Sequence, residues 1–501
     1  SNTLSYLTTF NNIHHLDFLA GYEIDDTYND YLSGEAYNFT TPDKHAISNG
    51  MKTVSVGGSD SKYRLVSYLS RLNYDYKNKY YLGASFRVDG SSRLHRDNRW
   101  GTFWSVSGAW RTIEEEFMQP VKDWLTDLRI RASYGVNGTL PSDYFGYMGL
   151  SSISGGYLEQ PGIQMSQIAN PNLKWETNYN MNIGLDFGFW DRLNFTIEYY
   201  TRTTKNLLMD CPVSMTTGFS SYLMNIGEVK NKGIELTINS TNIKIKDFNW
   251  NTTFNLGHNS NKVVKLDGEQ TQIVSGTQIH KVGSSYRTFY VQEFAGINPE
   301  TGNPLFYTNE LDENGNYIKE ITENSKNAQF IPYKHAEPTV NGGISNSLRY
   351  KWLDLNFLFS YQFGGYSYDT WAQKTEHGGY DSYANIPTYY RDSWKKPGDQ
   401  TNIEVYMPGK SSSVSMHKIT SSRRIHSTDY FRLKNITFGI TLPKEWTNKI
   451  NIGNVRFYAS ASNLWTWAAY DNYDPEAVSA GSATQTTPPL KTVTFGLNIN
   501  F

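Results

Sequence analysis

The sequence is poor in the features that mark most other classes of protein. Its 501 residues include one cysteine, Cys211, so no disulfide can form within the chain. No run approaches the roughly 18 apolar residues of a membrane-spanning helix, which excludes helical spans. The net charge is −2 and the two signs are interspersed, so no basic stripe indicates nucleic-acid binding.

Sequence motifs for catalysis and for cofactor binding are missing as well. We find no P-loop, no G-x-S-x-G elbow and no G-x-G-x-x-G before a helix. The 10 histidines include no HExxH pair, and His14 and His15 are adjacent, which places them on opposite faces of a strand. The sequence therefore predicts a protein that is not an enzyme, with no cofactor and no metal site.

Aromatic residues are plentiful. They make up 15% of the chain, with 37 Tyr and 13 Trp, while only 38% is hydrophobic and the mean hydropathy is −0.57. Tyr and Trp are the residues that settle at membrane interfaces, and a membrane barrel with a polar lumen need not be hydrophobic on average. A soluble all-β protein could share this composition.

The last stretch of the chain, residues 490–501, alternates without a break. Small polar residues occupy the even positions, and the odd positions hold Val493, Phe495, Leu497, Ile499 and Phe501. An extended strand with this pattern is apolar on one face and polar on the other. Its uncovered edge would aggregate unless another strand closed it, and only helices and closed barrels satisfy every backbone group within a bilayer.

The same alternation recurs along the chain and predicts about fifteen strands. They are Thr3–Asn11, His15–Ile24, Lys62–Asp75, Lys79–Asp89, Arg99–Arg111, Leu128–Val136, Trp175–Phe189, Leu193–Asn206, Asn231–Thr241, Phe248–His258, Thr339–Tyr350, Trp352–Phe363, Asp429–Leu442, Asn454–Leu464 and Leu490–Phe501.

The connections between these strands alternate between tight turns, such as Trp190-Asp191 and Lys351, and long polar loops, of which residues 25–61 are the first. Short turns on one side and long loops on the other are typical of an outer-membrane barrel. A β-sandwich also alternates, but its polar face is usually rich in Lys and Glu, whereas here it is mainly Asn, Thr, Ser and Gly. We therefore predict an all-β, transmembrane antiparallel β-barrel with long extracellular loops.

Several motifs resemble the barrel of the SusC/RagA family of TonB-dependent transporters. The resemblance begins with DGSSR at Asp89–Arg93, NRWG at Asn98–Gly101 and LRIRASYG at Leu128–Gly135, although Trp104 replaces a common proline. Further matching segments follow in the family's order and extend over nearly the whole chain: Asn170–Glu176, Asn182–Phe187, Gly227–Leu236, Asn261–Val264, Tyr430–Ile436 and Tyr473–Glu476.

The resemblance implies a barrel of about 22 strands with a plugged lumen. With fifteen strands here, residues 1–501 are expected to be the C-terminal part of the barrel. The first strands, the plug domain and its TonB box would then precede Ser1, where the sequence shows no signal peptide.

The resemblance also implies a function and a place. It predicts import of large nutrients, oligosaccharides or peptides, across the outer membrane of a Gram-negative, Bacteroidetes-like bacterium. The expected partners are a SusD-like surface lipoprotein, TonB, outer-membrane lipid or lipopolysaccharide, and the cargo. A siderophore or metal-chelate receptor and a passive porin-like barrel are the alternatives.

Aromatic residues gather in two predicted external loops, and we predict that they contact the cargo. Their flat faces can stack on sugar rings or hold peptide side chains, although rings also pack loop against loop or lie in the interfacial belt. The candidate ligand-binding residues are Tyr366, Tyr368, Trp371, Tyr380, Tyr383, Trp465, Trp467, Tyr470 and Tyr473.

Clusters of charged residues have simpler interpretations than catalysis. Asp471, Asp474 and Glu476 lack the spacing of a calcium loop, and residues 311–317 contain an Asn-Gly hairpin signal that outweighs their likeness to an ion-binding loop. Charged residues near the rim can steer acidic cargo or form an ion-paired wall, and we favour the wall for Arg87, Asp89, Arg93, Arg99 and Arg111.

Overall fold

A computed structural model describes residues 1–43, 46–157, 160–266, 271–379, 385–408, 419–450, 452–483 and 486–500. The chain divides into two compact units. Unit 1 contains residues 1–111, 131–182 and 202–228, and unit 2 contains residues 112–130, 183–201 and 229–501.

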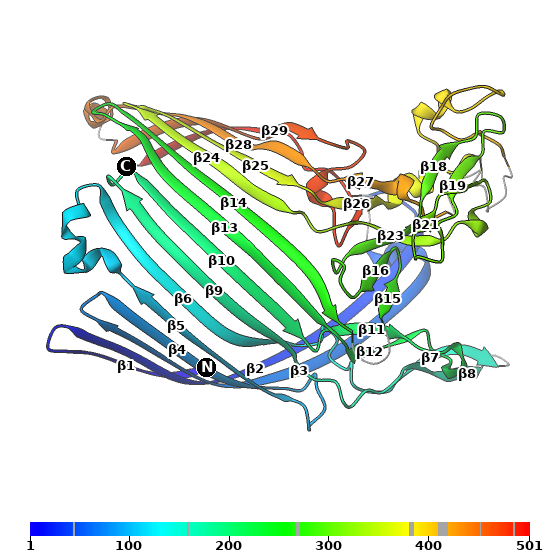
Figure 1. Cartoon of the computed structure of the whole chain (residues 1–501), viewed down its shortest axis with the longest axis horizontal. Helices are drawn as coiled ribbons and strands as arrows, with labels where there is room; N and C mark the ends of the chain where they lie inside the picture. Colours follow the sequence, from blue (N-terminus) through cyan, green and yellow to red (C-terminus); the bar gives the residue numbers. More distant parts are fainter. Residues whose placement is uncertain are drawn as a thin grey trace. The chain divides into compact units, whose positions relative to one another are not determined.

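One large sheet contains all fifteen predicted strands, which confirms that part of the prediction. Its strands follow one another in chain order (Figure 1). They are β1 (Asn2–Phe10), β2 (His14–Phe39), β3 (Gly50–Tyr76), β4 (Tyr80–Ser91), β5 (Trp100–Trp110), β6 (Leu125–Thr139), β9 (Glu176–Phe189), β10 (Leu193–Lys205), β13 (Glu228–Lys244), β14 (Phe248–Lys265), β24 (Val340–Tyr350), β25 (Leu353–Phe363), β28 (Tyr430–Thr441), β29 (Asn454–Ala468) and β31 (Thr492–Asn500).

Short turns join many of these strands at one end. In the turn at 10–13, the Ile13 N–H donates to the Phe10 carbonyl at 3.1 Å, and Asn11 and Asn12 have φ of 50° and 57°. The turn at Trp190-Asp191 follows the same pattern, with φ of 51° and 53°. Two consecutive positive φ angles give the turn a twist that matches the twist of the strands, so these turns fix the register.

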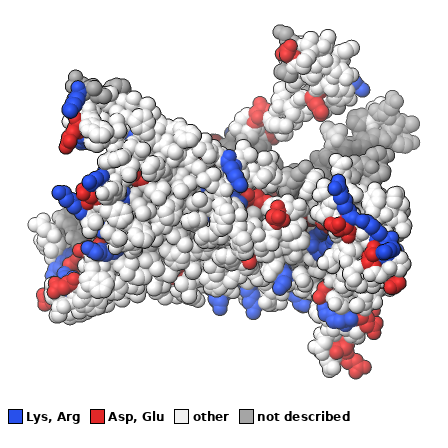
Figure 2. All heavy atoms as spheres, turned by 90° about the horizontal axis from the view of Figure 1, so that it is seen from above, with Lys and Arg blue, Asp and Glu red and all other residues white. Residues whose placement is uncertain are grey.

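The paired strands put apolar side chains on one face of the sheet and polar side chains on the other. Within unit 2, β29 and β31 pair antiparallel, and Phe495 lies opposite Ala459 while Thr494 lies opposite Ser460. Phe495 is 80% exposed, and the apolar face carries many other large exposed hydrophobic residues. Figure 2 shows wide areas of one face without Lys, Arg, Asp or Glu, with most charged residues toward its margins.

Aromatic rings mark both ends of the apolar face in unit 1. Near the turn at 77–79, Tyr80 stacks on Tyr76 and Trp110 with ring centroids 6.3 and 6.4 Å apart. Further along β3, Tyr68 packs against Tyr22 and Trp100. Eight residues separate Tyr68 from Tyr76, which is about 26 Å along a strand and about 20 Å along the axis of a barrel with the usual strand tilt, so the two groups of rings fit near the two boundaries of an apolar band about 25 Å tall.

One predicted loop is wrong. Residues 25–61 are not an irregular connection, because β2 and β3 continue as a hairpin and pair as far as Phe39 and Gly50. Backbone pairing persists where the side chains are polar and exposed, and a bidentate ion pair joins Asp26 to Arg64 across the strands at 2.6 and 2.7 Å. The regular alternation of apolar and polar residues was the signal for strands, and this part of the hairpin lacks it.

The connections on the other side of the sheet contain smaller sheets and short helices. The small strands are β7 (Leu150–Tyr157), β8 (Gln160–Gln167), β11 (Leu208–Pro212), β12 (Ser221–Asn225), β15 (Gln272–Ser275), β16 (Gln278–Lys281), β17 (Thr288–Gln292), β18 (Phe294–Ile297), β19 (Pro304–Tyr307), β20 (Glu310–Leu311), β21 (Tyr317–Ile318), β22 (Ile321–Thr322), β23 (Phe330–His335), β26 (Tyr366–Asp369), β27 (Ile425–Ser427) and β30 (Ser482–Ala483). Among the α-helices, α1 (Thr370–Thr375) lies in these connections, whereas α2 (Lys444–Thr447) joins β28 to β29 at the end of the sheet that carries the short turns.

The remaining helical turns are of the 3₁₀ type: Ile47–Asn49, Thr112–Glu114, Glu116–Val121, Met215–Thr217, Ser325–Asn327, Thr388–Asp392, Ser422–Arg424, Asn448–Ile450 and Pro475–Ala477. In the part of the chain that the structure describes, no helix has the length and apolar character needed to cross a membrane. The terminal strand is described up to Asn500, and Phe501 lies outside the described residues.

Two small hydrophobic cores hold the connections of unit 2 together. In one, Phe289, Val291 and Tyr368 are buried against each other, which joins β17 to β26. In the other, Phe306 packs with Ala328 and Ile419. Residues that are distant in sequence thus form one folded loop region, which we call the loop domain (residues 271–335, 364–379, 385–408, 419–429 and 469–483).

Candidate functional site

Asp369 organises the part of the loop domain that contains most of the predicted ligand-binding residues. It is fully buried and is the N-cap of α1, where its Oδ1 accepts a hydrogen bond from the Ala372 N–H at 2.7 Å. Its Oδ2 accepts from the Tyr470 hydroxyl at 3.0 Å and from Nδ2 of Asn472 at 2.8 Å. A single carboxylate therefore ties residues 470–472 to α1.

His426 on β27 lies flat against Tyr470. The two ring centroids are 3.7 Å apart and the planes differ by 3°. Burial lowers the pKa of His426 to about 4, although the nearby Asp369 carboxylate opposes this shift. The imidazole is therefore neutral at pH 7, and the stack is a contact between two uncharged rings.

Two adjacent arginines and one glutamate form a buried charged group beside this stack. Arg424 is 1% exposed and forms an ion pair with Glu376, and Arg423 Nε donates to Glu376 Oε2 at 3.4 Å. The Tyr389 hydroxyl donates to the same carboxylate. Burial lowers the pKa of Arg424 to about 10, so the guanidinium stays charged at neutral pH.

Two pockets share the wall that Asp471 and Asn472 make. The first, which we call the Trp371 pocket, has a volume of about 610 Å³. The second, which we call the Arg423 pocket, has a volume of about 700 Å³. Both volumes are in the range of small-molecule and oligomer subsites.

The two pockets offer different surfaces to a ligand. The Trp371 pocket is lined by two indoles, a phenol, carboxylates and amides, among them Trp371, Trp467, Tyr473, Asp369 and Asn463. The Arg423 pocket is lined by Phe294, Glu376, Tyr389, Asn402, Arg423, His426 and Tyr470. Each combines flat rings with hydrogen-bonding groups, which suits a ligand that has both apolar faces and hydroxyl or amide groups.

The predicted ligand-binding residues do not all lie in one site. Trp371, Trp467 and Tyr473 line the Trp371 pocket, and Tyr470 lines the Arg423 pocket. Tyr366 is half-buried, with Lys334 Nζ 5.3 Å from its ring centroid. Tyr380 and Tyr383 lie outside the described residues.

Tyr368 and Trp465 are placed differently from the other rings. Tyr368 is 1% exposed and packs with Phe289 and Val291, so in this conformation its ring supports the loop domain and offers no face to a ligand. Trp465 packs edge-on against Phe431 on the apolar face of the large sheet, at the end opposite the short turns. That is the position of an interfacial aromatic belt.

Sequence reasoning missed the charged residues of the Arg423 pocket. Arg423, Arg424 and His426 are close in sequence, but Glu376 is 47 residues from Arg423 and carries no motif. Only the pairing of β26 with β27, in which Ser367 lies opposite His426, brings these segments together. The adjacent arginines were a visible signal, but the sequence did not reveal their partner.

The acidic residues follow the simpler interpretations. Asp474 and Glu476 form ion pairs with Arg432, and Glu476 also pairs with Lys434 at 2.6 Å. In residues 311–317, Asp312 Oδ1 accepts from the Asn314 and Asn316 N–H groups and closes the hairpin turn between β20 and β21, as predicted. Among the described residues, no group of His, Cys, Asp and Glu is arranged to hold a metal ion.

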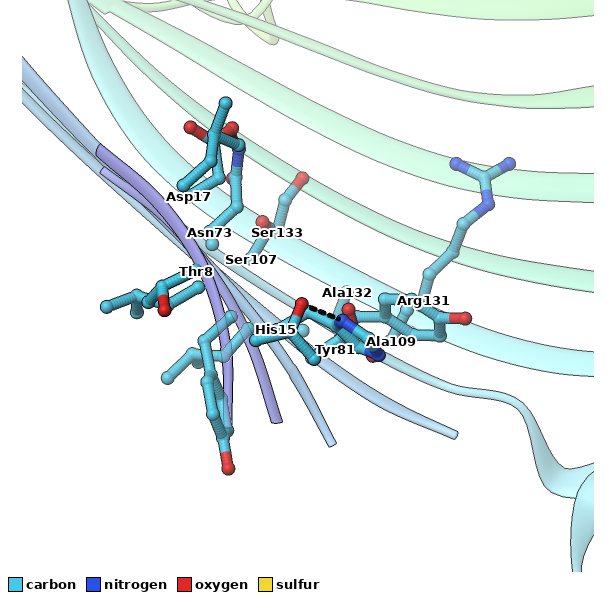
Figure 3. Close-up of a pocket in the computed structure, with 18 of the residues that line it drawn as sticks. Thr8, His15, Asp17, Asn73, Tyr81, Ser107, Ala109, Arg131, Ala132 and Ser133 are labelled. Carbon is cyan, nitrogen blue, oxygen red and sulfur yellow. Dashed lines mark hydrogen bonds between the residues drawn. The ribbon is translucent and has the colours of Figure 1, made fainter. Parts of the chain in front are cut away.

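Unit 1 contains a larger pocket, of about 800 Å³, near the short turns. Figure 3 shows Asp17, Asn73, Ser107 and Ser133 gathered there from β2, β3, β5 and β6. Asn73 Nδ2 donates to Asp17 Oδ2 at 3.3 Å. Nearby, the Thr9 hydroxyl and His15 Nδ1 are 3.0 Å apart. The pocket is therefore lined by neutral hydrogen-bonding groups and by Asp17, Asp75 and Arg131, together with apolar residues such as Leu7, Leu16 and Leu82.

An antiparallel sheet with one apolar face, aromatic rings at both ends of that face, short turns and large folded loops defines an outer-membrane β-barrel protein. The family model for the TonB dependent receptor-like β-barrel matches residues 1–317. The chain belongs to this family of TonB-dependent receptors, and its strands are strands of an outer-membrane barrel.

Individual relatives agree with this assignment. TonB-dependent receptor P3 of Formosa agariphila is 32% identical, over all of this chain and 52% of the relative. The TonB-dependent receptor SusC of Bacteroides thetaiotaomicron is 30% identical, over 94% of this chain and 47% of SusC. The chain thus spans about half the length of the curated relatives that it matches.

A solved structure of the RagAB peptide transporter is also similar. It has a TM-score of 0.86 and 27% identity, and the match covers all of this chain and 55% of the other. These relatives are receptors and transporters. The sequence motifs resembled the SusC/RagA family, and SusC and RagAB are both among the proteins that the chain matches.

Proposed function

We propose that this chain is part of a TonB-dependent importer that carries oligosaccharides or peptides across the outer membrane. The observation that carries the proposal is the similarity to SusC and RagA along nearly the whole chain, combined with a loop domain that contains pockets lined by aromatic rings. A structural relative is named as a peptide transporter. The expected partners remain a SusD-like surface lipoprotein and TonB.

We further propose that residues 1–501 form the C-terminal part of the barrel, and that the first strands and the plug domain belong to sequence outside these residues. Two features support this. The chain spans 52% of the relative P3, and the polar face of the sheet in unit 1 is hollowed where a plug would need polar contacts. Asp17, Asn73 and Ser107 would then contact the plug.

Within the loop domain, we propose that Trp371, Tyr470 and Tyr473 contact the cargo and that Asp369 positions them. The rings line the two pockets, and the Asp369 carboxylate holds Tyr470 through its hydroxyl. Cargo landing on these loops would be bound before force transmitted through TonB displaces the plug. Specificity would thus depend on the loops, while the strands provide the wall.

The alternatives differ in what they would bind. A siderophore receptor would take a small metal chelate, and a passive porin would select by size and charge and would need no TonB. Among the described residues, the two pockets are lined by rings, amides and charges of both signs, which favours a neutral or mixed cargo over a highly charged chelate.

Uptake in cells tests the proposal. Cells that carry the full-length receptor gene, a deletion of it, or the gene together with an inactive TonB are given fluorescent oligosaccharides and peptides of four to ten units. The proposal predicts accumulation that needs both the receptor and TonB. Uptake that is unchanged without TonB would support the porin, and uptake of iron chelates alone would support the siderophore receptor.

A further inference from the structure

A third pocket in the loop domain lies away from the predicted ligand-binding residues. It has a volume of about 530 Å³ and opens between the sheet of β15, β16, β17 and β23 and the hairpin of β20 and β21. We call it the Asn309 pocket; its lining consists of Gln272, Lys281, Tyr290, Asn309, Glu310, Leu311, Tyr317, Gln329, Phe330 and Pro332. Like the rest of the loop domain, it lies in the connections opposite the short turns.

Aromatic rings form the apolar part of this pocket. Tyr290 and Phe330, on neighbouring strands, have ring centroids 5.5 Å apart and planes inclined by 36°. Phe330 is 42% exposed, and Tyr317 on the hairpin is 43% exposed. An open, flat ring of this kind is a surface on which the C–H face of a sugar packs.

Amide side chains form the polar part. Gln272 and Gln329 are exposed, and in the part of the chain that the structure describes their side chains have no hydrogen-bond partner. A primary amide both donates and accepts hydrogen bonds, and so does each hydroxyl of a sugar. Two unengaged amides beside open rings therefore match a ligand with vicinal hydroxyl groups and an apolar face.

Asn309 adds a buried acceptor. The residue is 1% exposed and has φ of 51°. Its Nδ2 donates to the Glu293 carboxylate at 3.2 Å, and because a carboxylate only accepts, the nitrogen and oxygen of the amide are assigned by this contact. Within the described residues, Oδ1 has no partner. A buried acceptor without a donor is unfavourable by about 1–3 kcal/mol, so a ligand hydroxyl there would be favoured.

The charges of the pocket argue against other ligands. Lys281 is the one cation in the lining and Glu310 the one anion, so the lining has no excess positive charge for a sulfated or uronic-acid glycan. A peptide would satisfy its backbone best along a free strand edge, whereas this pocket offers ring faces and side-chain amides. Neutral glycans fit both the rings and the amides.

From these observations we infer that the Asn309 pocket binds a neutral oligosaccharide, with a sugar ring packed on Phe330 or Tyr317 and hydroxyl groups bonded to Gln272, Gln329 and Asn309. The role of this site in capturing cargo rests on the proposed import function, whereas the binding itself does not. The site would narrow the cargo from oligosaccharides or peptides to neutral glycans.

Calorimetry on the full-length receptor in detergent tests the inference. The probes are neutral hexasaccharides (cellohexaose, laminarihexaose, mannohexaose, maltohexaose and xylohexaose), a hexagalacturonate and a mixed hexapeptide pool. At least one neutral probe should bind, and Phe330→Ala and Tyr317→Ala should each raise its dissociation constant about ten-fold, which corresponds to about 1.4 kcal/mol. Asn309→Gly, which keeps the positive φ, should weaken binding in the same direction.

Tyr333→Ala is the matched control. Tyr333 is on the same strand as Phe330 and is 39% exposed, but it does not line the pocket, so its loss should leave the affinity unchanged. Heat-modifiable migration on gels shows that each variant has assembled. If Phe330→Ala fails this check, Gln272→Ala and Gln329→Ala, which alter exposed side chains only, carry the same expectation.

The inference is overturned if no neutral hexasaccharide binds, if binding is indifferent to all pocket variants, or if only the peptide pool or the hexagalacturonate binds in a pocket-dependent way. Cell uptake separates this inference from the proposed function. If a glycan binds in a pocket-dependent way but is not taken up, the site is supported and import is contradicted. If a glycan is taken up, and the pocket variants change neither its uptake nor its affinity, import is supported and the site is contradicted.

Discussion

The large sheet exposes apolar side chains, whereas the loop domain buries charged ones. On the apolar face of the sheet, Phe495 is 80% exposed and Leu4, which lies opposite Ala20, is 71% exposed, because lipid and not protein is meant to cover them. In the loop domain, Asp369 and Arg424 are almost completely buried among hydrogen-bonding partners. The sheet is therefore specified by a repeated apolar pattern, and the loops by a few paired polar groups.

The loop side of this comparison is tested most strongly at Asp369. Asp369→Ala removes the carboxylate that accepts three hydrogen bonds, from the buried Ala372 N–H, the half-buried Tyr470 hydroxyl and the exposed Asn472 side chain. We expect the loop domain to lose on the order of 3–5 kcal/mol of local stability. Limited proteolysis should show faster cleavage within residues 364–429, while heat-modifiable barrel migration stays normal.

Asp210→Ala is the control for this variant, because Asp210 is exposed on the small strand β11. Its proteolysis pattern should match that of the wild type. If Asp369→Ala abolished barrel assembly, the stability of the sheet would depend on the loop domain, which would contradict the comparison.

The sheet side is tested by placing one charge on either face of β31. Phe495→Arg puts a cation on the apolar face near the middle of the strand, and this should destabilise the assembled receptor by about 2–4 kcal/mol. Thr494→Arg, one residue away on the polar face, should have a much smaller effect. Urea unfolding of receptor reconstituted in lipid vesicles measures both, and equal effects of the two substitutions would contradict the assignment of the faces.

The pH dependence of the loop domain distinguishes buried neutral groups from exposed ones. Burial lowers the pKa of His426 to about 4, below the usual value of about 6.5, so between these values the unfolded loop binds more protons than the folded loop. Stability is then fully present above pH 6.5 and falls as the pH drops toward 4. From pH 7 to pH 5 the loss should be about 2 kcal/mol.

His426→Phe keeps a ring against Tyr470 but cannot titrate, so its loss of protease resistance between pH 7 and pH 5 should be smaller than that of the wild type. The other charged groups around this ring are Asp369, Arg423 and Arg424, and they are the same in both proteins. If the variant and the wild type lost the same protease resistance between pH 7 and pH 5, His426 would bind its proton as readily in the folded loop as in the unfolded loop. That result would contradict a lowered pKa.

The smallest expected effect concerns cargo. Trp371→Ala removes an indole that is 38% exposed and lines the Trp371 pocket, without touching the Asp369 hydrogen bonds. We expect cargo affinity to fall about ten-fold, or about 1.4 kcal/mol, with unchanged proteolysis. Trp465→Ala, which alters a ring on the apolar face, should leave affinity unchanged. Both can be measured by fluorescence titration of the full-length receptor with labelled cargo.

The strands of the large sheet could be predicted from the sequence because apolar and polar residues alternate along each of them. The turn at Trp190-Asp191 could be predicted because it separates two such strands. The extension of β2 and β3 could not, since Tyr28, Asp30 and Leu32 do not separate into apolar and polar faces there. In the loop domain, the rings at Trp371 and Tyr470 were visible as candidates. The buried status of Tyr368 and the pairing of Arg424 with Glu376 depend on contacts between distant segments, which no local pattern records.

Spin labelling along β31 tests the account most directly. Cysteines are placed one at a time at residues 492–500 of the receptor, with Cys211 replaced, and the labelled proteins are reconstituted in lipid vesicles. Oxygen, which concentrates in lipid, should reach the labels at positions 493, 495, 497 and 499 more readily than those between them, with a period of two. Labels that show no alternation, or that are all equally open to a water-soluble nickel complex, would contradict an outer-membrane wall.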